Sequence, residues 1–221
     1  MPKIHTSIIS VLLCLIFTMS LISGPPLCFA EELSGGQISN GSTGSAEADP
    51  NDIVVDFSKG TAGFQVDNIW KIQDTELQLV PNETTPSRFY WNLFPRHYVT
   101  DYQISVNVRW INGSLYSAYG LFFGERTGDF YAFLITLNNR VLLLKSVNGR
   151  WKTIKTAKNN TTGGTYDNLK VICRGPLVQC FVNEAKMFET KDKSLIDGCS
   201  IGVCSDGNVQ SGFSEFRLKK F

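Results

Sequence analysis

The stretch that decides the fold is residues 101–110, DYQISVNVRW, in which apolar and polar side chains alternate without a break. One face of an extended chain would carry Tyr102, Ile104, Val106, Val108 and Trp110, and the polar residues between them would lie on the other face. This period of two is typical of a strand that buries one face and leaves the other in water. We therefore predict an antiparallel sheet with a solvated face.

Runs of the same kind recur on both sides of this strand, and none of them has a helical period. We predict further strands at 53–57, 76–80, 88–93, 119–123, 130–137, 141–147, 150–155, 168–174, 177–183, 200–205 and 212–219. Many short strands with tight turns over residues 52–221 favour an all-β fold, a two-sheet antiparallel β-sandwich of the jelly-roll type.

Turn residues and one irregularity refine this picture. Asn148-Gly149 predicts a type I′ hairpin, because that turn needs positive φ at both central residues. Gly175-Pro176 predicts another short return between strands. Phe213 and Phe216 break the alternation of the last strand, and a β-bulge there would restore it.

The first residues are set aside as a signal peptide, residues 1–30. Lys3 is their only acidic or basic charge, residues 8–17 are apolar, and small residues precede a cleavage site after Ala30. Residues 31–51 are rich in Gly and Ser and are predicted to be a flexible linker. We expect an exported protein, periplasmic or extracellular, whose mature chain has no membrane span and whose single domain is residues 52–221. The alternative is an uncleaved membrane anchor at residues 4–23.

Charge and histidine content exclude several classes of partner and cofactor. The chain has 21 basic and 20 acidic residues, so a nucleic-acid partner is not predicted. His97 is the only histidine after residue 30, which argues against a histidine metal site and against a Ser-His-Asp triad. We predict no metal and no cofactor.

Longer segments of the domain resemble a known family. FSKGTAGFQVDNIW (57–70), YGLFFGERTGDFYAFLI (119–135) and CSIGVCSDG (199–207) are similar, in this order, to the concanavalin A-like, laminin G-like jelly rolls of bacterial secreted proteins. That group includes the 3-keto-disaccharide hydrolase domains and family-16-like domains. The resemblance covers residues 52–221 and implies the fold. Because such domains serve as sugar-binding modules, adhesive modules or enzymes, it implies no single activity.

The acidic residues decide between an enzyme and a binding module. A family-16-type glycosidase needs two carboxylates at alternate positions of one strand, and that pattern is missing. Glu125 and Asp129 instead flank Gly128 between two predicted strands, which indicates a hairpin rim. We predict no catalytic residue and an exported, non-catalytic recognition module for a glycan or a surface protein. The alternative is a glycoside hydrolase or lyase with an unrecognised set of acids.

The candidate ligand-binding residues are polar groups on one strand and two tryptophans. Gln103, Asn107 and Arg109 share the wet face of the 101–110 strand and are suited to sugar hydroxyls. Hairpin pairing sets Trp151 opposite Ser146, where its indole could stack on a sugar ring, and Trp91 is a second candidate. The alternatives are an ordinary solvated face and tryptophans that belong to the core.

Four cysteines follow residue 30, Cys173, Cys180, Cys199 and Cys204, and in an exported chain they are disulfide candidates with three connectivities. Cys199 and Cys204 bracket an extended run about 15 Å long and should not pair. Cys173 and Cys180 face inward and lie diagonally across a turn, so a bridge between them would be strained. The alternative is that some are buried thiols.

Overall fold

A computed structural model describes residues 51–94, 99–126, 129–160, 163–193 and 200–221, with the side chains of 125 and 126 left out. The predicted signal peptide, nearly all of the predicted linker, His97 and Cys199 lie outside these residues. The described elements are β1 (Asp52–Val55), η1 (Phe57–Lys59), β2 (Trp70–Gln73), β3 (Glu76–Leu79), β4 (Phe89–Leu93), β5 (Tyr102–Gly113), β6 (Ala118–Arg126), β7 (Asp129–Thr136), β8 (Arg140–Val147), β9 (Arg150–Lys158), β10 (Asp167–Arg174), β11 (Leu177–Val182), β12 (Ala185–Lys191), β13 (Ser200–Asp206) and β14 (Val209–Lys220).

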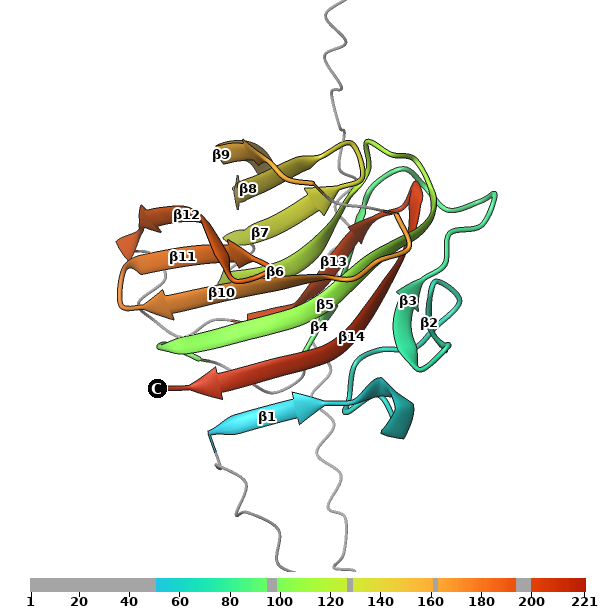
Figure 1. Cartoon of the computed structure of the whole chain (residues 1–221), viewed down its shortest axis with the longest axis horizontal. Helices are drawn as coiled ribbons and strands as arrows, with labels where there is room; N and C mark the ends of the chain where they lie inside the picture. Colours follow the sequence, from blue (N-terminus) through green and yellow to red (C-terminus); the bar gives the residue numbers. More distant parts are fainter. Residues whose placement is uncertain (1–50, 95–98, 127–128, 161–162, 194–199) are drawn as a thin grey trace, which may run out of the picture. The chain divides into compact units, whose positions relative to one another are not determined.

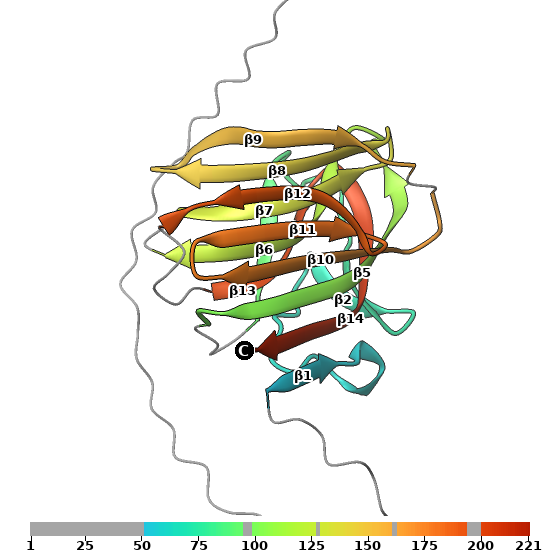
Figure 2. The same cartoon turned by 60° about the vertical axis from the view of Figure 1, so that its left-hand side comes forward.

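The strands form two antiparallel sheets, and no α-helix occurs in the described ranges (Figures 1 and 2). Sheet A has the order β12-β11-β10-β5-β14-β3-β2, with β1 also paired to β14. Sheet B has the order β4-β13-β6-β7-β8-β9. The predicted two-sheet antiparallel β-sandwich is confirmed.

The alternation of β5 works as predicted. Tyr102, Ile104, Val106 and Val108 are fully buried between the sheets, and Trp110 packs against the same core. In sheet B the core face is made by residues such as Leu121 and Phe133, so the residues between them point to the outer face. Each sheet therefore presents one outer face, and the candidate ligand-binding residues lie on these outer faces.

The predicted turns and bulge are present. Asn148 and Gly149 have φ of 51° and 72°, which a type I′ turn requires, and Gly175 in the β10–β11 turn has a φ of 50°. In β14 the register with β5 shifts between Ser214 and Arg217, with Glu215 at a φ of 49°, so both phenylalanines of this strand reach the core.

Two strands escaped prediction. β2 is the four-residue segment WKIQ, and β12 carries exposed charged residues at a sheet edge. Neither alternates regularly, because an edge strand needs to bury only part of one face. Their neighbours β3 and β11 supply the pairing that the sequence pattern does not show.

No disulfide forms among the three described cysteines. Cys173 and Cys180 face the core and are opposite Val178 and Val171, so their predicted diagonal placement is confirmed. Cys204 is buried against the outer face of sheet B, in a different layer. Burial raises the pKa of the Cys180 and Cys204 thiols, which keeps them protonated and weakly reactive.

Helices long and apolar enough to cross a bilayer are missing from the described ranges. Within the same ranges, no group of three or more His, Cys, Asp or Glu side chains could hold a metal ion.

Candidate functional site

The residues that the sequence nominates for ligand binding fall on two different surfaces. Gln103, Asn107 and Arg109 project from β5 onto the outer face of sheet A. Trp91 on β4 and Trp151 on β9 lie on the outer face of sheet B. Because the two sheets pack core to core, their outer faces point away from each other. The polar row and the tryptophans therefore cannot contact one sugar, and each surface needs its own assessment.

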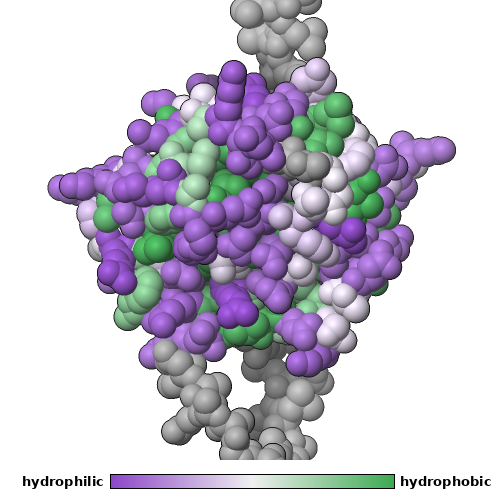
Figure 3. Space-filling model, in the orientation of Figure 1, coloured by the Kyte–Doolittle hydropathy of each residue, from purple (hydrophilic) through white to green (hydrophobic). Residues whose placement is uncertain are grey.

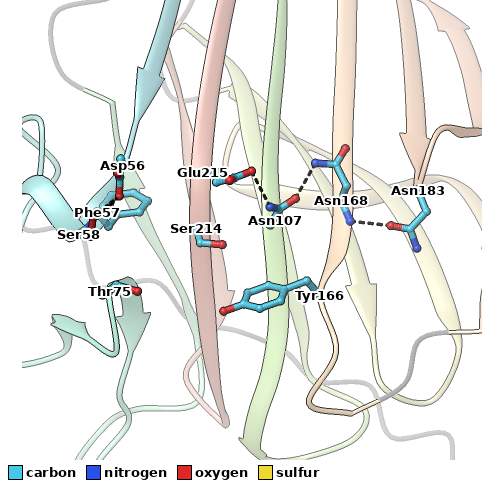
Figure 4. Close-up of a pocket in the computed structure, with 10 residues that line it drawn as sticks. All are labelled: Asp56, Phe57, Ser58, Thr75, Asn107, Tyr166, Asn168, Asn183, Ser214 and Glu215. Atoms are coloured by element: carbon cyan, nitrogen blue, oxygen red, sulfur yellow. Dashed lines mark hydrogen bonds between the residues drawn. The ribbon is translucent and has the colours of Figure 1, made fainter.

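The surface on sheet A contains a shallow hollow of about 460 Å³ (Figure 4). A chain of amides crosses it: Asn168 donates to Asn107 Oδ1 at 2.8 Å, Asn107 donates to Glu215 Oε2 at 3.1 Å, and the Asn168 backbone donates to Asn183 Oδ1 at 2.7 Å. These side chains come from strands or turns that are neighbours in the sheet. Their donors and acceptors largely satisfy one another, so the hollow holds a preformed polar network.

Arg109 does not line the hollow, but it lies over the ring of Tyr166, which does, and it is held by a buried carboxylate. Its Nε lies 3.1 Å from both carboxylate oxygens of Glu76, and its Nη2 lies 2.7 Å from Oε2. Tyr166 donates to Glu76 Oε1, and Gln78 donates to Oε2 at 3.1 Å. Glu76 is 1% exposed. Hydrogen bonding to Glu76 raises the pKa of Arg109, and burial raises the pKa of Tyr166.

The ion pair reaches across an intervening strand. Glu76 is on β3 and Arg109 on β5, and β14 lies between them, with Gly212 opposite Arg109 in the register. A Cβ at position 212 would lie 2.5 Å from Glu76 Oε2, so glycine is the residue that leaves room for the pair. Arg109 is thus the counter-ion of Glu76, and its guanidinium has little left to offer a ligand. Gln103, near the start of the strand, does not line the hollow.

The surface on sheet B is aromatic. A second cluster of buried apolar residues, separate from the main core, includes Phe122 and Phe130. The two exposed tryptophans join it: the ring centroid of Phe130 lies 5.7 Å from that of Trp91 and 5.0 Å from that of Trp151. Phe89 completes the group, 5.4 Å from Trp151. Trp91 is 44% and Trp151 is 43% exposed, so both indoles keep an accessible side.

These ring contacts also reveal the curvature of sheet B. Phe89 belongs to β4 and Trp151 to β9, which are the two edge strands of the sheet. Five strand spacings of about 4.8 Å would place the edges of a flat sheet roughly 24 Å apart. Their rings are 5.4 Å apart, so the outer face curls toward itself along the diagonal that joins these residues. The aromatic cluster therefore lies in a concave face.

The hairpin that carries Trp151 is fixed by local chemistry. Trp151 is opposite Ser146, as predicted. Asp129, at the start of the neighbouring β7, accepts a hydrogen bond from the backbone of Asn148 at 2.8 Å and so holds the turn. This engagement agrees with the predicted hairpin-rim role of Asp129. The Glu125 side chain and His97 lie outside the described residues.

Elsewhere on the described part of the chain, the surface features are less suited to a ligand. The view in Figure 3 shows a face that is mostly hydrophilic, with hydrophobic residues in small separate patches. The second hollow, next to η1, is lined by small apolar residues and by three charged ones, and no aromatic side chain lines it. In the sequence, the apolar outer face of sheet B is indicated by β6 and β7, whose odd- and even-numbered positions are both mostly apolar. β5 differs, because its apolar residues alternate with polar ones.

The fold is shared with solved structures at low sequence identity. A carbohydrate-binding module, CBM66 from Bacillus subtilis, is 12% identical with a TM-score of 0.59, over 77% of this chain and 96% of that chain. The fold is that of a concanavalin A-like sandwich. A β-glucanase from Bacillus licheniformis is similar to this concanavalin A-like domain at 11% identity and a TM-score of 0.61, over 77% of this chain and 99% of that chain. The GH43 protein BlXynB from the same organism is 13% identical with a TM-score of 0.62, over 78% of this chain and 39% of its own length.

The concanavalin A-like fold thus occurs in binding modules and in glycoside hydrolases, and likeness at this identity shows the fold alone. No family model and no curated protein matches the chain.

Proposed function

We propose that the chain is exported and that its concanavalin A-like domain is a non-catalytic module that binds glycans on the concave aromatic face of sheet B. The observation that carries the proposal is the pair of half-exposed indoles, Trp91 and Trp151, held 5.7 Å and 5.0 Å from the shared Phe130 ring. A contiguous exposed apolar patch marks a binding surface, and two half-exposed indoles on one aromatic cluster form such a patch.

The geometry suits a sugar ring better than a flat protein partner. An indole offers a rigid apolar plane that can stack on the C–H face of a pyranose, and each such contact contributes on the order of 1 kcal/mol beyond its buried area. A concave face lets one polysaccharide chain touch both indoles. The carbohydrate-binding module with the same fold supports this ligand class. The indoles rest on an apolar cluster, and an open face keeps few hydrogen bonds away from water, so we expect weak binding, with a Kd of roughly 1 μM to 1 mM.

The test is affinity electrophoresis and calorimetry of the purified domain against a panel of soluble polysaccharides. Trp151→Ala and Trp91→Ala should each weaken binding by roughly fivefold, the equivalent of about 1 kcal/mol. Tyr116→Ala is the matched control, because Tyr116 is 78% exposed and lies in the loop between β5 and β6. Its affinity should equal that of the wild type.

Three results would contradict the proposal. Binding that survives both tryptophan substitutions would place the glycan elsewhere, and a wild type that binds no glycan but binds a surface protein would make the module a protein adhesin. Release of reducing ends from any polysaccharide would make it a hydrolase.

Export has its own test. The N-terminus of protein recovered from the medium or periplasm should be Glu31, and recovery with residues 1–30 still attached would indicate an anchor instead.

A further inference from the structure

The β8–β9 hairpin, residues 140–158, carries a concentrated positive charge that a count over the whole chain hides. It holds six of the chain's 21 basic residues and none of its 20 acidic residues. The six are Arg140, Lys145, Arg150, Lys152, Lys155 and Lys158. Since the chain is nearly neutral overall, this hairpin is a local exception.

Most of these charges have no counter-ion among the residues that the structure describes. Lys145 pairs with Asp192. The other five take part in none of the ion pairs formed between described residues, and all five are exposed. They stand on the edge of sheet B, because β9 is its outermost strand (Figures 1 and 2). Side chains on both faces of an edge strand can reach a ligand that lies along it.

The pairing between the two strands brings like charges together. Arg140 is directly opposite Lys158, and Lys145 is directly opposite Lys152. Like charges in directly opposed positions of an antiparallel pair destabilise it. An anion bound beside these pairs would relieve the repulsion. β9 also carries Trp151, which shares its side of the sheet with Arg140 and Lys158, whereas Arg150, Lys152 and Lys155 project from the other side of this edge strand.

Protection of an exposed edge is the competing explanation, because lysines on edge strands discourage pairing with other chains. The other long edge strand, β12, shows what such protection needs here. It carries Lys186 and Glu189 in an ion pair at 3.0 Å, so mixed charges suffice. Edge protection does not explain why every charged residue of β9 is a cation, or why two of these cations lie opposite Arg140 and Lys145 on β8.

We propose that the glycan bound by this module is acidic, a polysaccharide that bears carboxylate or sulfate groups and runs along β9 from Trp151 toward Lys158. This inference rests on the proposed glycan-binding function and specifies its ligand class. β9 has nine residues and extends for about 30 Å, which is enough for several sugar units. The cations supply attraction over a Debye length of about 10 Å at 0.1 M salt, and the indole supplies the contact with a ring.

The experiment uses matched polymers that differ in charge alone. Binding of the domain is measured for dextran against dextran sulfate, and for hydroxyethylcellulose against carboxymethylcellulose, at two salt concentrations. At low salt we expect each charged polymer to bind at least about tenfold more tightly than its neutral partner, with a difference that shrinks as salt rises. The two pairs separate sulfate from carboxylate recognition. Random-sequence duplex DNA is the control polyanion, because it carries negative charge but has no sugar rings available for stacking on an indole.

Charge-reversal variants test whether the cations of β9 cause the preference for charged polymers. Lys152→Glu/Lys155→Glu should abolish the preference for charged polymers and leave binding of neutral ones unchanged. The comparison variant is Lys186→Glu/Lys191→Glu on β12, which also reverses two exposed charges on an edge strand; it breaks the Lys186–Glu189 ion pair but should retain the preference. Both variants keep a charged edge, so each should stay folded.

A second readout does not need a ligand. Lys158→Glu places a carboxylate opposite Arg140, so its melting temperature should rise relative to the wild type, and this gain should shrink as salt screens the two charges.

The outcomes separate the two proposals. Equal binding of charged and neutral polymers, an effect of the β12 reversal equal to that of the β9 reversal, or DNA binding as tight as that of dextran sulfate would overturn the acidic-glycan inference while glycan binding stands. If no polysaccharide binds at all, the proposed function falls together with the inference.

Discussion

Replacing Arg109 by methionine should unfold this domain at a markedly lower temperature, although the residue is on an outer face. The substitution keeps an unbranched, apolar side chain in place and removes the guanidinium. It deletes three hydrogen bonds to Glu76, which is 1% exposed, and leaves that carboxylate with Tyr166 and Gln78 as its donors. Breaking a buried ion pair by removing one partner costs about 3–5 kcal/mol, because the remaining charge is desolvated without compensation.

The structure sets where in that range the effect should fall. The Arg109 side chain is 24% exposed, so water can partly replace it, and a loss of about 3 kcal/mol is expected. For a domain of this size, 1 kcal/mol corresponds to about 2–4 °C, so the melting temperature should fall by roughly 6–12 °C. Arg217→Met is the matched control, because Arg217 is exposed on the neighbouring β14 and joins no ion pair among the described residues. Its stability should stay within about 0.5 kcal/mol of the wild type.

Urea denaturation of four proteins completes the test: wild type, Arg109→Met, Glu76→Gln, and the double variant. The double variant should be more stable than Arg109→Met, because no unpaired charge remains buried. A loss below about 1 kcal/mol in Arg109→Met, or a double variant no more stable than that single variant, would refute the reasoning.

Three further predictions concern the hairpin turn and the thiols. Gly149→Ala should destabilise the domain by about 1–2 kcal/mol in urea denaturation, because an L side chain at a φ of 72° is strained, and an unchanged midpoint would contradict the type I′ turn. Asp129→Ala should cost about 0.5–1.5 kcal/mol through loss of its bond to the Asn148 backbone, whereas Asp129→Asn keeps an acceptor and should be nearly neutral in stability and in glycan binding. Cys180 and Cys204 should resist alkylation at pH 8 in the native protein, because burial raises the pKa of both thiols, and should react rapidly in denaturant without reductant; a disulfide-linked peptide containing either one would contradict this.

The sequence was sufficient for the fold because its signals are local. The alternation of β5, the Asn148-Gly149 turn and the bulge near Glu215 each depend on residues within one strand or one hairpin. The missed strands β2 and β12 are short or at an edge, where burial on one face imposes little pattern.

The candidate site was harder to predict, because it depends on which strands become neighbours. Alternation placed Arg109 on a wet face correctly, but no local pattern links it to Glu76, 33 positions earlier and two strands away in the sheet. The tryptophans at 91 and 151 were nominated one at a time, and their meeting at Phe130 follows from the order and curl of sheet B. Opposed cations on β8 and β9 likewise become visible only once the register is known.

The place of β14 has a consequence for the order in which the molecule can assemble. β14 pairs with β5 on one side and with β3 and β1 on the other, so the elements near the start of the domain find their partner in residues 209–220. Until a ribosome has made those residues, β1 and the β2–β3 hairpin have no sheet to join. Contacts between such distant parts of a chain slow folding, because the chain loses the entropy of closing a long loop before any stabilising contact forms. The domain should therefore stay open until residues 209–220 are available, and it closes when β14 inserts between β5 on one side and β3 and β1 on the other.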